Sequence, residues 1–394
     1  MPNAYIVGAA RTATGRKKGR LSQIHPVDLG AMVVDELLSR TRAPVDQVDD
    51  LIWGVVCQIG AQASNCGRHV SMSSRLALEV PGTTVDRQCG SSLQAIQFGA
   101  QAVMSGTQDL VICGGVEAMS TVEIGSNVRD GLANGRGKPK GQRLEEQYPG
   151  IQFSQFDGAE LLAAKYGISR DELDAFGFRS HQLAAQATSN GYFKAEVVPI
   201  QIVKEDGSTD MHTVDEGIRF NATLDAMRGL NPLREGGVIT AGTSSQISDG
   251  SAAVMVANEE AVKKYGLTVR AKIHSLAVVG SDPVIMLEGP IPATRKVLAR
   301  AGLKLSDIDL YEVNEAFGSV PLAWAKALDA DLARLNVNGG AQALGHPLGG
   351  TGAKLMTTLV HELERREARY GLVAICEGGG TANAMIIERM NKAA

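Results

Sequence analysis

Two regions of the chain repeat the same order of polar and apolar positions. In each region an acidic turn leads into a short apolar run, and a second apolar run that ends near glycines follows further along. Short apolar runs bounded by turn residues indicate buried strands. The predicted strands lie within residues 45–56 and 109–118 of the first region, and within 305–316 and 371–382 of the second. The repetition predicts two related halves that face each other.

Between its two strands, each region carries a stretch with helical periodicity. Apolar residues recur at intervals of three and four in residues 90–106, and residues 352–366 have a comparable pattern. This spacing places the apolar side chains on one face of a helix. Strands that alternate with helices predict parallel sheets covered on both faces, in which ligands bind beyond the carboxyl ends of the strands. The glycine clusters of the chain fall at these predicted strand ends.

A stretch of different composition separates the two regions. Residues 119–249 are richer in glycine, polar residues and charge. Because long structureless loops are uncommon in compact domains, we expect an inserted subdomain that covers the sheets and includes a helix at 170–190. The predicted organisation is an N-terminal half of residues 1–118 plus 250–269, an inserted loop domain of residues 119–249 and a C-terminal half of residues 270–394.

Composition narrows the class of function. The chain has 394 residues, of which 44% are hydrophobic and 21% charged, as is typical of globular proteins. A net charge of −4 and a pI near 6.0 give no electrostatic basis for binding nucleic acid. No apolar run reaches the roughly eighteen residues that a membrane span needs. The N-terminus does not read as a secretory signal, so we expect a cytoplasmic protein without a membrane partner.

The cysteine pattern and the missing motifs exclude several chemistries. The five cysteines lack CxxC spacing, which favours reduced thiols over a disulfide framework or a zinc site, and no metal is expected. The chain has no Walker loop, GxGxxG, GxSxG or HExxH motif. Phosphate-loop, dinucleotide, serine-hydrolase and zinc-protease chemistry are therefore not indicated.

Four residues stand at predicted strand ends or in glycine-bounded turns. Cys89 lies where an apolar run gives way to the helix at 90–106, and the positive end of a helix should make a thiol lose its proton more readily. Taken alone, such a cysteine is more often a small buried apolar residue. His346, Asn314 and Cys376 are structural residues if each is taken alone. Together the four supply a nucleophile, an imidazole, a second acid/base and oxyanion donors, as thiol acyl transfer requires.

The segments around these residues resemble the motifs of the thiolases, in the same order and along nearly the whole chain. They are DRQCGSSLQA around Cys89, VNEAFGSV around Asn314, NVNGGAQALGHPLGGTGAK around His346 and CEGGG at Cys376. The resemblance implies an α/β fold in which two βαβαβαββ halves form a five-layered α-β-α-β-α core with an inserted loop domain. It also implies a homodimer or homotetramer that acts on acyl-CoA with coenzyme A as co-substrate and no permanently bound cofactor.

The resemblance implies a role for each residue that matches a family motif. Cys89 would be the acylated nucleophile, and His346 would promote its thiolate form and bind the thioester oxygen with a water held by Asn314. Cys376 would protonate the departing acetyl-CoA enolate and then deprotonate the incoming coenzyme A. The main-chain N–H groups of Cys89 and Gly378 would form a second oxyanion site. Weaker similarity assigns contacts with coenzyme A to four further residues, Arg219, Ser245, Ala316 and Phe317.

Departures from the family pattern bear on the substrate. Acetoacetyl-CoA thiolases typically show MGxGP, CxGGGxG and a His-Met pair, where this chain has MLEGP at 286–290, CEGGGTANA at 376–384 and SQFDGAE at 154–160. We therefore predict a 3-ketoacyl-CoA thiolase that cleaves a longer lipid or steroid side-chain substrate to acetyl-CoA and a shortened acyl-CoA. The alternatives are an acetoacetyl-CoA thiolase working in the condensing direction and a non-catalytic protein that binds acyl-CoA or lipid. The second cysteine disfavours a decarboxylative condensing enzyme.

Overall fold

The predicted apolar runs form strands in the computed structural model, which describes residues 2–390. In spatial order, the first half contributes β4 (Gly82–Val85), β3 (Asp50–Gly54), β5 (Leu110–Ala118), β9 (Ser248–Ala257) and β1 (Tyr5–Thr12). The second half contributes β11 (Leu310–Val313), β12 (Tyr370–Glu377), β13 (Thr381–Arg389) and β10 (Ala271–Gly280). The strands β1 and β10 pair over two residue pairs, so the half-sheets join edge to edge in one 11-stranded sheet.

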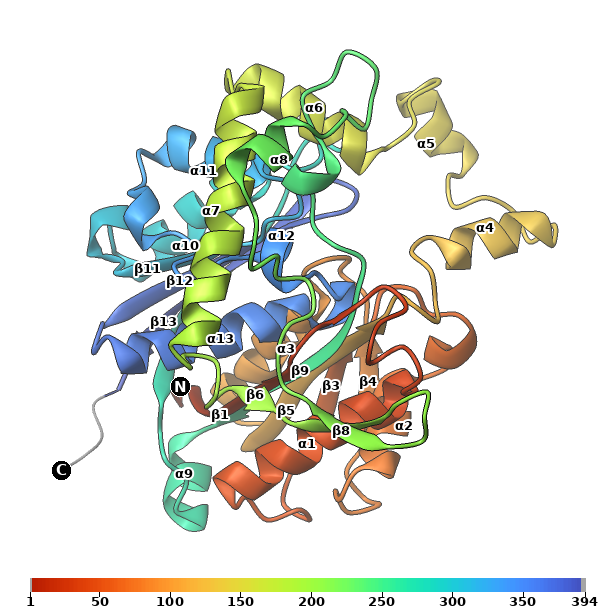
Figure 1. Cartoon of the computed structure of the whole chain (residues 1–394). Coiled ribbons are helices and arrows are strands. Elements are labelled where there is room, and N and C mark those ends of the chain that lie inside the picture. The colour runs from red at the N-terminus through yellow and green to blue at the C-terminus, as the bar shows by residue number, and fades with distance from the viewer. Residues whose placement is uncertain (1, 391–394) are drawn as a thin grey trace.

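Helices cover and separate the half-sheets (Figure 1). The outer face of the first half carries α1 (Pro26–Thr41) and α2 (Cys66–Ser73), and that of the second half carries α10 (Pro290–Ala301) and α11 (Ser319–Leu328). Between the half-sheets lie α3 (Ser91–Ser105) and α13 (Thr351–Arg365). The order of layers is therefore helix, sheet, helix, sheet, helix, as the sequence resemblance implied.

The central helices are buried on almost every side. Both carry the periodic patterns predicted for residues 90–106 and 352–366, and they start and end within one residue of those bounds. Their apolar side chains join those of both half-sheets in one hydrophobic cluster, which includes Leu93 and Ile96 of α3 with Leu355 and Leu359 of α13. Burial of this kind is the main favourable term in folding. It also fixes the N-terminal ends of the two helices against each other.

The two halves repeat details of hydrogen bonding as well as the order of elements. Asp49 accepts the main-chain N–H groups of Asp109 and Leu110 through Oδ2, at 2.7 and 3.0 Å. Asp309 accepts those of Arg369 and Tyr370 in the same way, both at 2.8 Å. Each aspartate thus ties the turn before one parallel strand to the start of its neighbour. The acidic turns noted in the sequence therefore have the same structural task in both halves.

The segment between β5 and β9 forms the helical cover and extends beyond it. Its longest helix is α7, and α4 and α5 lie away from the sheets (Figure 1). Its helices are α4 (Ser126–Ala133), α5 (Gln142–Gln147), α6 (Gln155–Lys165), α7 (Arg170–Ser189) and α8 (Leu224–Arg228). Its strands are β6 (Val197–Val198), which pairs with β1, and the hairpin of β7 (Ile200–Val203) and β8 (Thr209–His212). The predicted domain boundaries stay a prediction.

The remaining elements are short. They are β2 (Gly15–Arg16), α9 (Glu259–Tyr265), α12 (Ala341–Leu344) and single 3-10 turns at Gly60–Gln62, Ala241–Thr243, Leu305–Asp307, Leu332–Arg334 and Leu348–Gly350. Of these, α12 and the turn at Leu348–Gly350 flank His346 and lead directly into α13. No helix of the described residues is long and apolar enough to cross a membrane.

Candidate active site

The starts of the two central helices bring the predicted residues together. The main-chain N–H of Ala353 in α13 donates to Ser92 Oγ in α3 at 3.0 Å. A side chain at Gly352 would overlap the main chain of Leu93, so only glycine allows this approach. Because Cys89 precedes α3 and His346 precedes α13, the helix contact places both segments at one end of the central layer.

Cys89 sits on a sharply turned stretch of backbone. The residue before it, Gln88, has a φ of 49°, in the left-handed region that non-glycine residues rarely adopt. The side chain of Asp86 supports this turn by accepting the N–H of Gln88 at 2.7 Å. The thiol is 8% exposed and lines a cavity of about 450 Å³. The turn therefore holds the sulfur at the edge of a cavity that a ligand can enter.

The expectation that the helix end lowers the pKa of Cys89 is wrong for the protein without substrate. Burial raises this pKa to about 12, and the carboxylates of Glu377 and Glu117 add to the effect. The neighbouring main-chain N–H acts in the opposite direction but is outweighed. Desolvation disfavours the charged thiolate more than the helix end favours it. The thiol is thus protonated at neutral pH, and a nucleophilic role would require a base to remove its proton.

His346 has the protonation state of such a base. The hydroxyl of Thr351 donates to Pro347 O at 2.9 Å, so its oxygen accepts the N–H of His346 Nδ1 at 2.6 Å. This assignment leaves the lone pair on Nε2. Burial lowers the pKa of His346 to about 3, and the charge of Lys354 contributes. The ring is therefore neutral at pH 7 and can take a proton at Nε2.

Asn314 follows β11 and faces the same ring. Its Nδ2 lies 3.4 Å from His346 Nε2, while no hydrogen-bond donor among the described residues reaches its buried Oδ1. Its main-chain N–H donates to Ala374 O at 3.0 Å, which ties it to the end of β12. A buried amide usually satisfies its oxygen. The free Oδ1 is therefore a candidate acceptor for a group that enters the site.

Cys376 is placed near Cys89 by the end of β12. Its thiol is fully buried. Burial raises its pKa well above the ordinary value, and charge on Cys89 and on Glu377 raises it further. The structure thus brings the two cysteines within electrostatic reach of each other, although they belong to different halves of the chain.

Glu377, which the sequence did not single out, is the acidic group with the largest electrostatic effect on both thiols. Its Oε2 accepts the hydroxyl of Thr381 at 2.7 Å, but its buried Oε1 has no donor among the described residues. Burial raises its pKa to about 8. The equivalent carboxylate of the first half, Glu117, accepts four hydrogen bonds, from the main chain of Val56, Cys57 and Gly349 and from the side chain of Gln62. The signal in the sequence was the position of Glu377 directly after Cys376.

The cavity beside Cys89 is mostly apolar. Gly378 lines it together with Cys89, and the role of their main-chain N–H groups as oxyanion donors stays a prediction. The apolar lining residues come from the loop after β3, from the inserted segment and from the second half: Val56, Ile124, Val128, Phe153, Met286 and Leu348. An apolar wall next to a thiol suits an acyl chain.

The residues predicted to contact coenzyme A come from the inserted segment and from the loop after β11. Ser245 donates its main-chain N–H to Ala316 O at 2.9 Å, and the buried ring of Phe317 packs edge-on against Phe156 at a centroid distance of 5.5 Å. Arg219 is exposed on the segment after β8, and its main-chain N–H donates to His181 Nδ1 at 3.1 Å. Ser245, Ala316 and Phe317 thus adjoin one another, and Gln246, next to Ser245, donates its side-chain N–H to Gly217 O at 2.9 Å, two residues before Arg219.

Two further groups that the sequence analysis missed belong to the first turn of α13. They are Thr351, which orients the imidazole, and Lys354, whose ammonium donates to the main chain just before His346. Both lie inside the recognised motif around His346 and gave no separate signal. Residues 2–390 contain no group of three or more histidine, cysteine or acidic residues able to hold a metal ion, and the five cysteines are unpaired.

Comparison with known proteins agrees with this geometry. The family model described as thiolase, N-terminal domain, matches residues 4–260, and that for the C-terminal domain matches residues 267–389. The steroid 3-ketoacyl-CoA thiolase FadA6 of Mycobacterium tuberculosis is 50% identical over 392 residues, covering 99% of this chain and 95% of the relative. The 3-ketoacyl-CoA thiolase of Bacillus subtilis is 41% identical over 399 residues, covering 98% and 100%.

The fold comparison leads to the same family. The crystal structure of human mitochondrial 3-ketoacyl-CoA thiolase superposes with a TM-score of 0.89 at 37% identity, covering 99% of both chains. This agreement confirms the predicted thiolase fold. The chain belongs to the thiolase family of acyltransferases.

Proposed function

We propose that this protein is a 3-ketoacyl-CoA thiolase that uses coenzyme A to cleave its substrate into acetyl-CoA and a shortened acyl-CoA. The proposal rests on two thiols, Cys89 and Cys376, that lie within electrostatic reach of each other, and on a neutral His346 that precedes the helix packed against the start of α3. A binding protein would not need two thiols and a base in one place. The names of the relatives support the same reaction.

In the first half-reaction, the sulfur of Cys89 attacks the 3-keto carbon of the substrate and its proton passes to His346 Nε2. The bond between carbons 2 and 3 then breaks, and its electron pair leaves on acetyl-CoA as an enolate. Cys376 gives this enolate its thiol proton. The shortened acyl group remains as a thioester on Cys89, so a raised resting pKa for both thiols fits their roles as proton carriers.

In the second half-reaction, the thiolate of Cys376 takes the thiol proton of coenzyme A, and the resulting thiolate attacks the acyl-enzyme. Cys89 leaves as a thiolate and recovers its proton from His346. We assign one oxyanion site to His346 and a water bound by Asn314 Oδ1, and a second to the N–H groups of Cys89 and Gly378. No permanent cofactor takes part, because coenzyme A is consumed as a substrate.

The contacts with coenzyme A, the assembly and the cellular location complete the proposal. Ser245, Ala316 and Phe317 form one contact surface for coenzyme A, with Arg219 as an exposed basic group. The homodimer or homotetramer and the cytoplasmic location stay predictions.

We expect longer or ring-bearing 3-ketoacyl-CoA substrates to be cleaved at least about tenfold more efficiently than acetoacetyl-CoA, because each buried methylene contributes roughly 0.8 kcal/mol. The apolar cavity beside Cys89 supplies the wall for these groups. The measurement is kcat/KM for thiolysis across short, long and polycyclic substrates. A distinctly higher kcat/KM for acetoacetyl-CoA than for every longer substrate would instead identify a short-chain enzyme.

We expect Glu377→Gln to raise the acylation rate in alkaline solution relative to the rate in neutral solution. The pKa of Glu377 is raised to about 8, so its carboxyl ionises as pH rises through that value, and the new charge disfavours both thiolates. Gln stays neutral, so the ratio of the single-turnover rate at pH about 9 to that at pH about 7 should rise by roughly threefold or more.

The matched control for this prediction is Glu388→Gln on the neighbouring strand β13, where the carboxylate pairs with Arg369. This variant should keep the rate ratio of the unaltered protein. Equal pH profiles for Glu377→Gln and the unaltered protein would show that Glu377 does not tune the thiols.

A further inference from the structure

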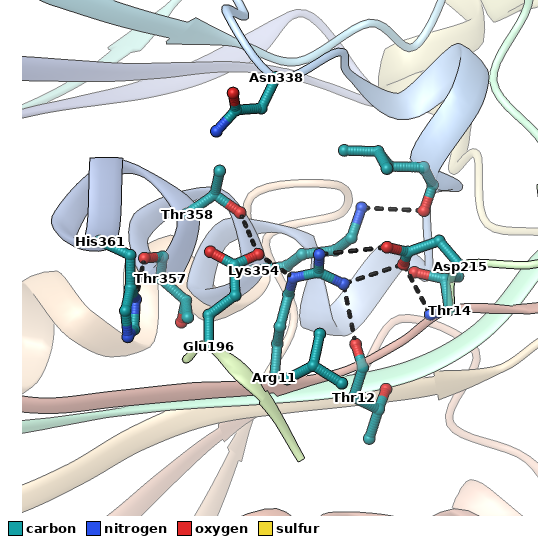
Figure 2. Close-up of polar contacts among 12 residues, drawn as sticks. Arg11, Thr12, Thr14, Glu196, Asp215, Asn338, Lys354, Thr357, Thr358 and His361 are labelled. Carbon is teal, nitrogen blue, oxygen red and sulfur yellow. Dashed lines mark hydrogen bonds and ion pairs between the residues drawn. The ribbon is translucent and has the colours of Figure 1, made fainter. Parts of the chain in front are cut away.

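A buried group of charges lies behind the histidine, outside the cavity that the proposed reaction uses. Figure 2 shows the guanidinium of Arg11 between Glu196 and Asp215, with Lys354 beside them. The Nε of Arg11 lies 2.6 Å from Glu196 Oε1, and its two terminal nitrogens reach the two oxygens of Asp215 at 2.9 and 3.1 Å. All four side chains are almost completely buried. Burying charged groups costs desolvation free energy, which their mutual attraction offsets only if the geometry and the remaining hydrogen bonds are good.

This group links the three parts of the chain. Arg11 belongs to β1 of the first half, Glu196 and Asp215 to the inserted segment, and Lys354 to α13 of the second half. Further hydrogen bonds hold the two carboxylates in place. The hydroxyl of Thr358 in α13 donates to Glu196 at 3.1 Å, and the main-chain N–H of Thr14, just after β1, donates to Asp215 at 2.8 Å. Lys354 lies within electrostatic reach of both carboxylates, although the elements that carry them are distant in the sequence.

The ammonium of Lys354 contacts the main chain that carries the histidine. It donates to Leu344 O at 3.0 Å and to Gly345 O at 3.1 Å. Gly345 has a φ of 78°, so the chain turns here in a conformation that favours glycine. His346 follows directly, and Thr351, one helical turn before Lys354, binds its Nδ1. The first turn of α13 thus holds both the backbone and the ring of His346.

The charge of Lys354 also acts on the ring. It is the second cause, after burial, of the lowered pKa of His346. Burial lowers the pKa of Lys354 itself to about 8, with Asp215, Glu196 and Glu312 opposing this shift and Arg11 adding to it. The ammonium is therefore mostly charged at pH 7. The neutral side chain of Asn314 faces the ring, and Ser248 Oγ accepts the main-chain N–H of His346 at 3.1 Å.

We propose that Lys354 is a positioning residue for His346: its ammonium clamps the two carbonyls before the histidine, and the carboxylates of the Arg11 group attract that ammonium. The inference rests on the proposed role of His346 as the proton acceptor for Cys89. Lys354 touches neither substrate nor the reacting atoms in this scheme, so its effect passes through the histidine.

The test compares Lys354→Met, which removes charge and donors, with Lys354→Arg, which keeps both. Lys354→Met should lower kcat of thiolysis by about 10- to 100-fold with little change in KM for coenzyme A, since a small misplacement of a base has effects of this size. As pH falls, alkylation of Cys89 by iodoacetamide should begin to slow at a higher pH in Lys354→Met than in the unaltered protein. The reason is that the imidazole of His346 becomes easier to protonate. Lys354→Arg should restore part of both properties.

Two further variants separate the possible outcomes. Arg366→Met removes an ion-paired cation from the far end of the same helix and should leave kcat and the alkylation profile unchanged. Unaltered kcat and alkylation profile in a folded Lys354→Met protein would overturn the positioning role. The role would also be overturned if Lys354→Arg and Arg366→Met were as impaired as Lys354→Met, because the losses would then reflect damage to the whole helix. His346→Ala with full activity would instead overturn the proposed function itself.

Discussion

Cys89→Ala is expected to slow thiolysis by on the order of 10⁴-fold or more, because it removes the atom that carries the acyl group. The turn at Gln88 and the start of α3 place the sulfur at the cavity edge, and no other side chain of the proposed site can form a thioester at that point. Cys376 is fully buried at a strand end and is assigned to proton transfer. The measurement is steady-state turnover together with trapping of a labelled acyl group on the denatured protein.

The control for this variant is Cys113→Ala. Cys113 is a fully buried thiol on β5 and is absent from the cavity beside Cys89. This variant should still trap the labelled acyl group, which separates the loss of a specific nucleophile from the loss of any buried thiol. A labelled acyl group held covalently by the Cys89→Ala protein would assign the nucleophile to another residue.

Local sequence patterns were sufficient for most of the framework. The periodicity of residues 90–106 and 352–366 predicted α3 and α13 because each helix has a strong apolar face that neighbouring strands bury. The acidic turns at Asp49 and Asp309 marked equivalent strands because each carboxylate bonds the adjacent parallel strand. Both signals come from interactions whose partners lie close to the element itself or repeat in the other half.

Properties that depend on distant partners could not be predicted in this way. The pKa of Cys89 is raised because the fold buries the thiol and brings the charge of Glu377 of β12 near it, and nothing in DRQCGSSLQA indicates either. The helix end alone suggested the opposite shift. Likewise, Lys354 stands in the motif around His346, but Asp215, whose charge acts on it, belongs to the inserted segment and comes near only through the fold.

The edge-to-edge joining of the half-sheets was also not predicted. It depends on two residue pairs between β1 and β10, and nothing in the sequence of either strand indicates that it pairs with the other. The contrast between Glu117 and Glu377 has the same origin. The two carboxylates occupy equivalent strand ends, but four donors surround the first and one reaches the second. Their different roles are set by neighbours from the other elements.

Cys376→Ala is expected to lower turnover by roughly 10³-fold while leaving Cys89 open to alkylation by iodoacetamide. The reason is that Cys376 is assigned to proton transfer alone: it protonates the enolate of acetyl-CoA and removes the proton of coenzyme A. The same role predicts that the protein exchanges the methyl hydrogens of acetyl-CoA with deuterium from the solvent, and that Cys376→Ala abolishes this exchange. Mass spectrometry of acetyl-CoA recovered from deuterated buffer measures it.

Cys376→Ser provides the matched control, because a hydroxyl of similar size fills the same space at the end of β12 but is a far weaker acid than a thiol. If packing alone mattered, Cys376→Ser would exchange and turn over like the unaltered protein. If the thiol proton matters, Cys376→Ser should resemble Cys376→Ala in both assays, with alkylation of Cys89 intact. Unchanged turnover in Cys376→Ala would remove this residue from the mechanism and would leave Glu377, with its pKa of about 8, as the acid with the largest electrostatic effect on Cys89.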